Sequence, residues 1–194
     1  LAFLPFDKTP LRQKVIMAVG RLDDWHYKGF DILIASWGRI CRRFPDWKLC
    51  IAGYGDERDI KTINLMIEKN GAINISLLGF RHDIEQLFRN AEIFVLSSRY
   101  EGFGLVLIEA MSQGCACIAC DHKGRQKEIL GNENAGLLCQ VGDTNDLAVK
   151  IEKMIGDNQL RESIRKHGLE RAKYFSLEKT IERWYALFES LNIY

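Results

Sequence analysis

The chain has 194 residues, of which 47% are hydrophobic and 27% charged, and its net charge is +1. These values are typical of a single globular domain. A nearly neutral chain exerts little long-range attraction on nucleic acid or anionic membranes, so any anion site must be built from a few placed residues. No apolar run approaches the roughly 18 residues of a membrane-spanning helix.

We do not interpret the opening of the chain as a signal peptide. The first residue is Leu rather than Met, and the opening LAFLPFDKTP has neither the basic start nor the apolar length of a signal peptide. We therefore expect a piece of a longer protein. We expect that protein in the cytoplasm, where it can act at the inner face of the membrane.

Short apolar runs alternate with longer amphipathic runs along the chain. The short runs are almost continuously hydrophobic, as strands covered on both faces are. The expected strands are Val15–Val19, Lys48–Gly53, Ile75–Gly79, Ile93–Ser97, Cys115–Ala119 and Gly136–Cys139. The expected helices are Phe30–Arg43, Asp56–Lys69, Asp83–Asn90, Leu105–Gln113, Lys127–Leu130, Asn145–Ile155, Gln159–Tyr174 and Leu177–Leu191.

Repeated strand–helix units predict right-handed crossovers and a parallel sheet with helices on both faces. The expected fold class is α/β, a doubly wound, six-stranded, Rossmann-like sheet with a C-terminal helical tail. No repeat or linker divides the chain, so we expect one domain over 1–194. In the common order 3-2-1-4-5-6, ligands bind beyond the carboxyl ends of strands one and four. This order brings the loop at 20–29 opposite the loop at 97–104.

Six cysteines are present, and two of them, Cys117 and Cys120, form a single CxxC. The surrounding CACIAC is short, apolar and β-prone, and no second CxxC or pair of histidines lies nearby. We therefore interpret the cysteines as free thiols of the core in a reducing compartment, and we expect no metal site.

The loop SSRYEGFG leads into the helix expected to begin near Leu105. Gly102 and Gly104 allow the backbone to approach a ligand and to adopt dihedral angles that a side chain resists. The unpaired N–H groups and positive dipole end at the helix N-terminus suit an anion such as phosphate. Glu101 precedes this helix, and Glu109 lies roughly 6 Å along its axis from Leu105. Two carboxylates that can accept bonds from hydroxyls therefore bracket the anion site.

Both glutamates also have a structural interpretation, Glu101 as an acid at a helix N-terminus and Glu109 as a solvated residue. The second interpretation is weaker, because LVLI and AM flank Glu109 in a helix that should be largely buried. A buried carboxylate needs partners, so we favour a functional role.

The loop after the first strand supplies cations. Arg21 and Lys28 lie on either side of GRLDDWHYKGF, and Gly29 opens the next helix. Arg can bind two phosphate oxygens at once, and Lys adds a mobile point charge. Facing a helix N-terminus, these two residues are expected to bind a diphosphate. We interpret His26 as a surface residue, since a lone His has many uses.

A central diphosphate with hydroxylated rings at both ends describes a nucleotide sugar or a dinucleotide. The dinucleotide interpretation needs G-x-G-x-x-G after the first strand, followed by an acid at the end of the second. The first strand is followed by GRLDDW, and GYGDER has two of the three glycines and follows the second strand. The nucleotide sugar therefore fits better.

These motifs resemble the C-terminal, donor-binding half of retaining GT-B glycosyltransferases, specifically glycosyltransferase family four, the glycosyl transferases group 1. They occur in the order of that family and cover nearly the whole chain, and the glutamate pair around a glycine turn is the specific part. The matching segments are GRL at 20–22, KGF at 28–30, IAGYGDE at 51–57, LLGF at 77–80, LSSRYEGFGLVLIEAMSQG at 96–114, NAGLLCQVGDTNDLA at 134–148 and a C-terminal FS…W.

The resemblance implies roles for individual residues. Arg21 and Lys28 would bind the donor diphosphate and, with Glu101 beside the transferred sugar, form the catalytic set. Glu109 would bind the ribose, and Phe80–Asp83 would lie against the base. The full set of expected donor-binding residues is Arg21, Lys28, Gly53, Phe80, Arg81, Glu101, Gly102, Phe103, Gly104, Leu105 and Glu109.

The resemblance also implies hexosyl transfer, with retention at the anomeric carbon, from a nucleotide sugar to a saccharide or lipid-linked acceptor in polysaccharide or glycolipid assembly. UDP is the expected nucleotide. No cofactor or metal is expected, because the Arg/Lys pair and the helix N-terminus would stabilise the leaving diphosphate, and neither loop contains a DxD motif.

The chain departs from the family pattern in three places. Cys115 stands where proline is usual, and CDHKGRQKEIL carries the basic residues Lys123, Arg125 and Lys127, which could be solvated or could influence donor choice or acceptor binding. The family also needs an N-terminal acceptor domain, often with a catalytic histidine, and nothing before Val15 can supply it. We therefore expect the isolated chain to bind a nucleotide without transferring sugar.

Two other functions remain open from the sequence. One is half of a nucleotide-sugar 2-epimerase, an enzyme also built of two such domains. The other is a non-catalytic module that binds nucleotide sugars. A nucleic-acid partner is not expected, because the charge is balanced and aromatic and basic residues do not interleave.

Overall fold

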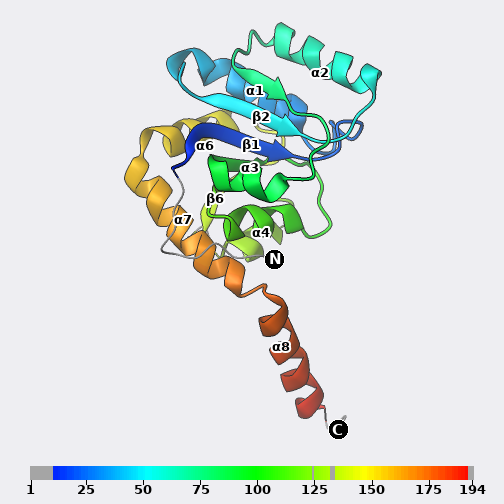
Figure 1. Cartoon of the computed structure of the whole chain (residues 1–194), viewed down its shortest axis with the longest axis vertical. Helices are drawn as coiled ribbons and strands as arrows, with labels where there is room; N and C mark the ends of the chain where they lie inside the picture. The colour runs from blue at the N-terminus through cyan, green and yellow to red at the C-terminus, as the bar shows by residue number, and fades with distance from the viewer. Residues whose placement is uncertain (1–10, 124, 132–133, 192–194) are drawn as a thin grey trace.

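The computed structural model describes residues 11–123, 125–131 and 134–191. Its centre is a six-stranded parallel sheet of order β3-β2-β1-β4-β5-β6 (Figure 1). The predicted fold class and strand order are confirmed, while the opening ten residues lie outside the described part. The strands are β1 Gln13–Val19, β2 Lys48–Ala52, β3 Ile75–Leu77, β4 Ala91–Leu96, β5 Ala116–Cys120 and β6 Gly136–Cys139.

The helices follow the predicted ones closely. The first expected helix is divided, because α1 ends at Ile40 and a 3-10 turn covers Cys41–Arg43. The short helix after β5 begins two residues earlier than expected. The helices are α1 Phe30–Ile40, α2 Glu57–Lys69, α3 Ile84–Asn90, α4 Leu105–Ser112, α5 Arg125–Leu130, α6 Thr144–Gly156, α7 Asn158–Lys173 and α8 Leu177–Ser190.

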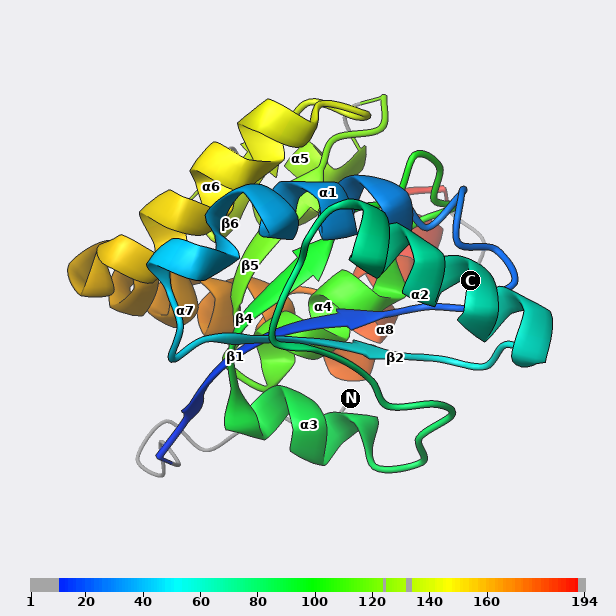
Figure 2. The same cartoon turned by 90° about the horizontal axis from the view of Figure 1, so that it is seen from above.

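Helices cover both faces of the sheet (Figure 2). Buried residues of α1, α2 and α6 pack on one face, and those of α3, α4 and α5 pack on the other. Helix α7 contributes to both layers, through Ile164 on the first and Ala172 on the second. The sheet is therefore buried on both sides, as its nearly continuous apolar strands predict.

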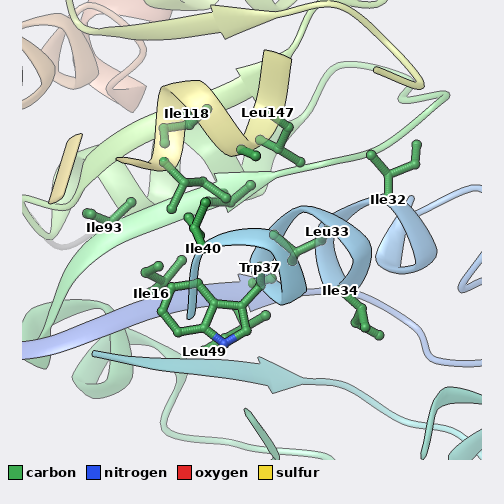
Figure 3. Packing of buried hydrophobic residues seen from close by; sticks show 14 of the residues in the cluster. Ile16, Ile32, Leu33, Ile34, Trp37, Ile40, Leu49, Ile93, Ile118 and Leu147 are labelled. Atoms are coloured by element: carbon green, nitrogen blue, oxygen red, sulfur yellow. The ribbon is translucent and has the colours of Figure 1, made fainter. Parts of the chain in front are cut away.

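The core under α1 packs that helix against the sheet. Trp37 is fully buried among aliphatic side chains that include Ile16 and Leu49 (Figure 3). Its indole Nε1 donates a 2.8 Å hydrogen bond to the Ile73 carbonyl, so the one polar atom of the side chain is satisfied. This packing holds α1 and the loop before it in one position.

All six cysteines are buried free thiols, which confirms their interpretation as core residues. The neighbour of Cys120 is Cys139 rather than Cys117, and the two Sγ atoms are 3.2 Å apart. These residues are direct partners in the β5–β6 register. Burial raises the pKa of the Cys115 thiol to about 12.

Helix α8 differs from the other helices, because it extends away from the body of the domain (Figure 1). None of its residues is buried, although it carries an apolar stripe that includes Ile181, Trp184 and Leu187. Ser176 caps its start by accepting a bond from the Lys179 amide. Over the described residues, no helix combines the length and the apolar character that crossing a membrane requires.

Candidate functional site

The loop after β4 ends in a glycine that starts α4. Gly104 has φ 91°, in the left-handed region that an L side chain rarely adopts. Because it precedes Leu105 and has no side chain, it cannot cap the first N–H groups of the helix. These N–H groups and the helix dipole therefore face the loop as a local positive pole.

Gly102 is not constrained in the same way. Its φ is not positive, and a Cβ added to it would meet no atom within 4 Å. The prediction that both glycines adopt special dihedral angles is therefore confirmed for Gly104 and wrong for Gly102 in this structure. A small residue at Gly102 still leaves the hollow beside it open.

Lys28 reaches across from the loop after β1 and pairs with Glu101. Its Nζ lies 2.8 Å from Glu101 Oε1, and the two side chains are 26% and 13% exposed. The same oxygen accepts a 2.8 Å bond from Ser98 Oγ. Glu101 therefore pairs with Lys28 and accepts a bond from Ser98. These two contacts hold its side chain at the edge of the site.

The two loops touch directly at Gly29, the residue before α1. Its φ is 65°, and a Cβ there would overlap the carbonyl oxygen of Ser97. The Ser97 hydroxyl donates a 2.8 Å bond to the Lys28 carbonyl, and the Arg99 amide donates to the Tyr27 carbonyl over the same distance. Only glycine allows the loops to approach this closely.

Arg99 adds a clamp between the same loops. Its guanidinium makes two 2.7 Å bonds to the Asp31 carboxylate and a 2.6 Å bond to the His26 carbonyl. The Asp31 pair raises the pKa of Arg99 through its hydrogen bonds. His26 itself is exposed, as expected, and its ring takes no part in the clamp.

Arg21 is largely exposed and pairs with acids of its own loop. Its guanidinium makes two bonds to the Asp23 carboxylate, one of them 3.0 Å from Nε, and lies 3.8 Å from Asp24. These bonds hold the pKa of Asp23 below its usual range and raise that of Arg21. An anion that binds Arg21 must therefore compete with Asp23.

A cleft of about 560 Å³ lies between the two loops at the carboxyl ends of β1 and β4. It brings together nearly all of the predicted diphosphate and sugar residues at the point where the winding of the sheet reverses. Its lining consists of Val19, Gly20, Arg21, Asp24, Lys28, Glu101, Phe103, Gly104, Leu105, Val106 and Glu109.

Glu109 is less buried than its place in a buried helix predicts. The helix α4 is mostly buried, but Glu109 lies half-exposed at the edge of the cleft. Among the residues that the structure describes, its carboxylate has no hydrogen-bond or ion-pair partner. The carboxylate is therefore solvated and available to a ligand.

A smaller hollow of about 210 Å³ adjoins the cleft and is lined by three more of the predicted residues, Gly53, Phe80 and Arg81, while Gly102 lines neither of the two. It shares Val19, Gly20 and Arg21 with the cleft, so the two form one continuous depression. A Cβ at Gly53 would overlap the Gly20 carbonyl oxygen, which gives this glycine a packing role as well.

The basic residues after β5 divide into different roles. Arg125 Nη1 donates to the Gly102 carbonyl, which supports the glycine turn from below. The Lys127 amide donates to Asp121, and Lys123 is exposed with φ 54°. The structure therefore links Arg125 to the shape of the site and leaves Lys123 on the surface.

Sequence reasoning missed the residues that position the site. Ser97, Ser98 and Arg99 follow β4, and the first two are buried although they are polar. Hydroxyl residues directly after an apolar strand weakly indicate such a positioning role, since buried polar groups are hydrogen-bonded.

Within the described ranges, no three His, Cys, Asp or Glu side chains group as a metal site.

The sequence model of the family described as Glycosyl transferases group 1 matches residues 5–171. The chain belongs to this family. The predicted resemblance is thereby confirmed at the level of the family, on a fold and a strand order that the structure shows independently.

The relatives of this chain include glycosyltransferases that assemble glycans. The chain is 34% identical, over 87% of the length of this chain, to one enzyme of Campylobacter jejuni. That enzyme is N-acetylgalactosamine-N,N'-diacetylbacillosaminyl-diphospho-undecaprenol 4-alpha-N-acetylgalactosaminyltransferase. That match covers 45% of the relative, and a match to an uncharacterized glycosyltransferase of Haemophilus influenzae covers 51%. The chain thus spans about half the length of the curated relatives that it matches.

Solved structures of similar fold include TarM of S. aureus, in a complex that contains UDP, with TM-score 0.81 and 26% identity over 96% of this chain and 38% of that one. HepE of Anabaena in complex with UDP has TM-score 0.80 and 27% identity, over 94% and 50%. The C-terminal domain of the group 1 protein LpcC from Francisella tularensis has TM-score 0.75 and 26% identity, over 89% of this chain and 94% of that one.

Proposed function

We propose that this chain is the donor-binding half of a retaining hexosyltransferase of glycosyltransferase family four, which uses a nucleoside diphosphate sugar, in particular a UDP-sugar. The observation that carries the proposal is the 560 Å³ cleft, in which Lys28, Arg21 and the start of α4 surround one space. Glu109 and Glu101 also line this cleft. Structures of similar fold that contain UDP support the choice of nucleotide.

In this proposal the diphosphate binds between Lys28 and the first turn of α4. Phosphate oxygens would accept bonds from the uncapped N–H groups after Gly104, and Lys28 would turn from Glu101 toward them. Arg21 would release the Asp23 carboxylate and bind a phosphate oxygen in its place. These groups stabilise the charge that develops on the leaving diphosphate, so no metal is needed for that purpose.

The two glutamates would bind hydroxyls at opposite ends of the donor. Glu109 is solvated and unpaired among described residues, so it can accept both hydroxyls of a ribose without breaking an existing contact. Glu101 is held by Lys28 and Ser98 and would lie beside the transferred sugar. The smaller hollow at Phe80 would take the base.

Transfer would require an acceptor domain in addition to this one. The chain spans about half of its curated relatives, 45% of the Campylobacter jejuni enzyme, and a solved C-terminal domain of the family has nearly the same extent. That relative acts on an undecaprenol-linked saccharide, which supports a saccharide or lipid-linked acceptor at the inner face of a membrane. We expect the isolated chain to bind the donor without turnover.

Calorimetric titration with UDP, UMP and uridine tests the binding mode. We expect Arg21→Ala and Lys28→Ala each to weaken UDP binding by about 1.5–3 kcal/mol, the range for hydrogen bonds to charged groups. The effect should shrink for UMP and vanish for uridine. Lys14→Ala is the matched control, because Lys14 pairs with Asp46 on the surface.

The ribose role is tested separately with Glu109→Ala. We expect it to weaken UDP and uridine binding by the same factor, because both ligands carry the ribose, whereas Glu68→Ala on exposed α2 should change neither. Failure of UDP to bind at millimolar concentration would overturn the proposed function. An unchanged uridine affinity in Glu109→Ala would overturn the ribose role alone.

A further inference from the structure

A second hollow, of about 380 Å³, adjoins the cleft at its Glu101 end. We call it the tyrosine hollow, and its lining is Asp24, Tyr27, Lys28, Tyr100, Glu101 and Gly102. It shares Asp24, Lys28 and Glu101 with the cleft, while Glu109 lines only the cleft of the two. The order along the surface is therefore Glu109, then the Lys28–Glu101 pair, then the tyrosines.

The walls of this hollow are two aromatic rings that the fold leaves uncovered. Tyr27 is 61% exposed and Tyr100 is 56% exposed. The Tyr100 ring makes an edge contact with the His122 ring, with centroids 4.9 Å apart, and the Tyr27 ring makes one with the His26 ring, with centroids 5.8 Å apart. Exposed aromatic rings beside charged groups suit a ligand that has one apolar face and a polar rim.

The backbone segments that carry the two tyrosines are joined, although 73 residues separate them in the sequence. The Arg99 amide bonds the Tyr27 carbonyl, and the Arg99 guanidinium bonds His26 and Asp31. Because these bonds join the two segments, both tyrosines line one hollow. Less conformational freedom is then lost on binding than with two independent loops.

The floor of the tyrosine hollow offers hydrogen-bond acceptors. Glu101 Oε1 already accepts bonds from Lys28 and Ser98, but in the described chain no residue donates to Oε2. The Asp24 carboxylate lies 3.8 Å from Arg21 and is also partly free. Aromatic walls over carboxylate acceptors match a pyranose ring, which has C–H groups on its faces and hydroxyls around its edge.

We propose that the tyrosine hollow binds the terminal pyranose ring of the acceptor saccharide, an inference that rests on the proposed function. The donor diphosphate would occupy the Lys28 end of the cleft and the transferred sugar would lie beside Glu101. An attacking hydroxyl must come within about 3–3.5 Å of the anomeric carbon. A ring that carries this hydroxyl then lies beyond Glu101, against Tyr27 and Tyr100.

The test uses the chain saturated with UDP and a panel of methyl glycosides of glucose, galactose, mannose, N-acetylglucosamine and N-acetylgalactosamine. Saturation-transfer NMR measures contact with each glycoside, and calorimetry measures UDP affinity in the same variants. We expect at least one glycoside to bind the wild type, and its signal to fall at least fivefold in Tyr27→Ala/Tyr100→Ala. The Tyr27→Phe/Tyr100→Phe variant should retain the signal, because its rings can still stack.

Tyr185→Ala is the matched control, because Tyr185 is equally exposed, at 55%, on the distant α8. UDP affinity should stay within twofold in every tyrosine variant, and thermal unfolding should confirm that each variant is folded. Absence of any tyrosine-dependent glycoside signal while UDP still binds would overturn the acceptor site. Failure of UDP itself to bind would instead overturn the proposed function.

A last arm separates the acceptor from the donor sugar. We expect the double alanine variant to bind UDP-glucose and UDP-N-acetylglucosamine as tightly, relative to UDP, as the wild type does. A selective loss of UDP-sugar affinity with UDP affinity unchanged would assign the tyrosine hollow to the donor sugar and overturn the inference.

Discussion

The two loops that form the cleft contribute in different ways. The loop after β1 supplies charge through Arg21 and Lys28, and in the structure each of these cations is already paired with an acid. The loop after β4 supplies geometry, because Gly104 places the uncapped start of α4 at the cleft without any side chain. Side-chain charge can be exchanged between partners, whereas the backbone pole is fixed by the fold.

The largest expected effect comes from the point where the two loops touch. We expect Gly29→Ala to lower the free energy of unfolding by about 2–5 kcal/mol, because its φ is 65° and the new Cβ would overlap the Ser97 carbonyl. Urea unfolding followed by circular dichroism measures the change. Gly156→Ala at the end of α6 has open space and no positive φ, so it should cost nothing or stabilise slightly. Equal stability of both variants would contradict the contact.

The Arg99 clamp comes next. Arg99→Ala removes the bonds to Asp31 and to the His26 carbonyl. It should lower the free energy of unfolding by about 1.5–3 kcal/mol, since the pair is mostly shielded and the Asp31 carboxylate would lose both of its bonds. Arg81→Ala is the control, because Arg81 pairs with Asp83 on the surface, where solvent screens the pair, and should change stability much less. The same denaturation assay compares the two. A larger loss in Arg81→Ala would show that the clamp does not join the loops.

Glu101→Gln tests whether the ion pair between Lys28 and Glu101 lowers the affinity for an anion. This substitution keeps the shape but removes the negative charge 2.8 Å from Lys28, so Lys28 is freed for phosphate. We expect UDP affinity to rise about fivefold, or about 1 kcal/mol, in calorimetry at low salt. Glu57→Gln at the start of α2 should leave it unchanged. A fall in UDP affinity would show that Glu101 helps the diphosphate to bind.

The smallest effect is expected at Asp23. Asp23→Asn should tighten UDP binding by about twofold, because Arg21 is exposed and solvent screens its pair. The bonds from Arg21 hold the pKa of Asp23 below its usual range, so this carboxylate stays charged at neutral pH and only loses its charge in acid. Asp46→Asn, which frees Lys14 on the surface, is the control. An equal gain in UDP affinity in the control would show that the effect comes from the net charge of the protein and not from the Arg21–Asp23 pair.

The strands were predictable from their period and hydrophobicity, and the sheet order followed once the common order of a doubly wound fold was assumed. Strands buried on both faces read as short apolar runs, and right-handed crossovers leave few orders, so the opposition of the two loops followed. The residues with unusual chemistry, such as Glu101 and Lys28, also stood out from their apolar flanks.

The pairing of charges could not be predicted. Nothing in the sequence shows that Lys28 binds Glu101 while Arg21 binds its own neighbour Asp23, because side-chain partners depend on loop conformation. The same holds for Glu109, whose half-exposed position depends on which side of α4 faces the cleft. The clamp by Arg99 depends on two segments that meet only in the folded chain.

The apolar stripe of α8 has a consequence for the behaviour of concentrated samples. Because Ile181, Trp184 and Leu187 are exposed together, molecules should self-associate through them, and ammonium sulfate should strengthen this association. Added salt should weaken diphosphate binding instead, since it screens charge. A version that ends at Ser176 should therefore stay monodisperse in light scattering while its nucleotide titration curve and salt response remain the same.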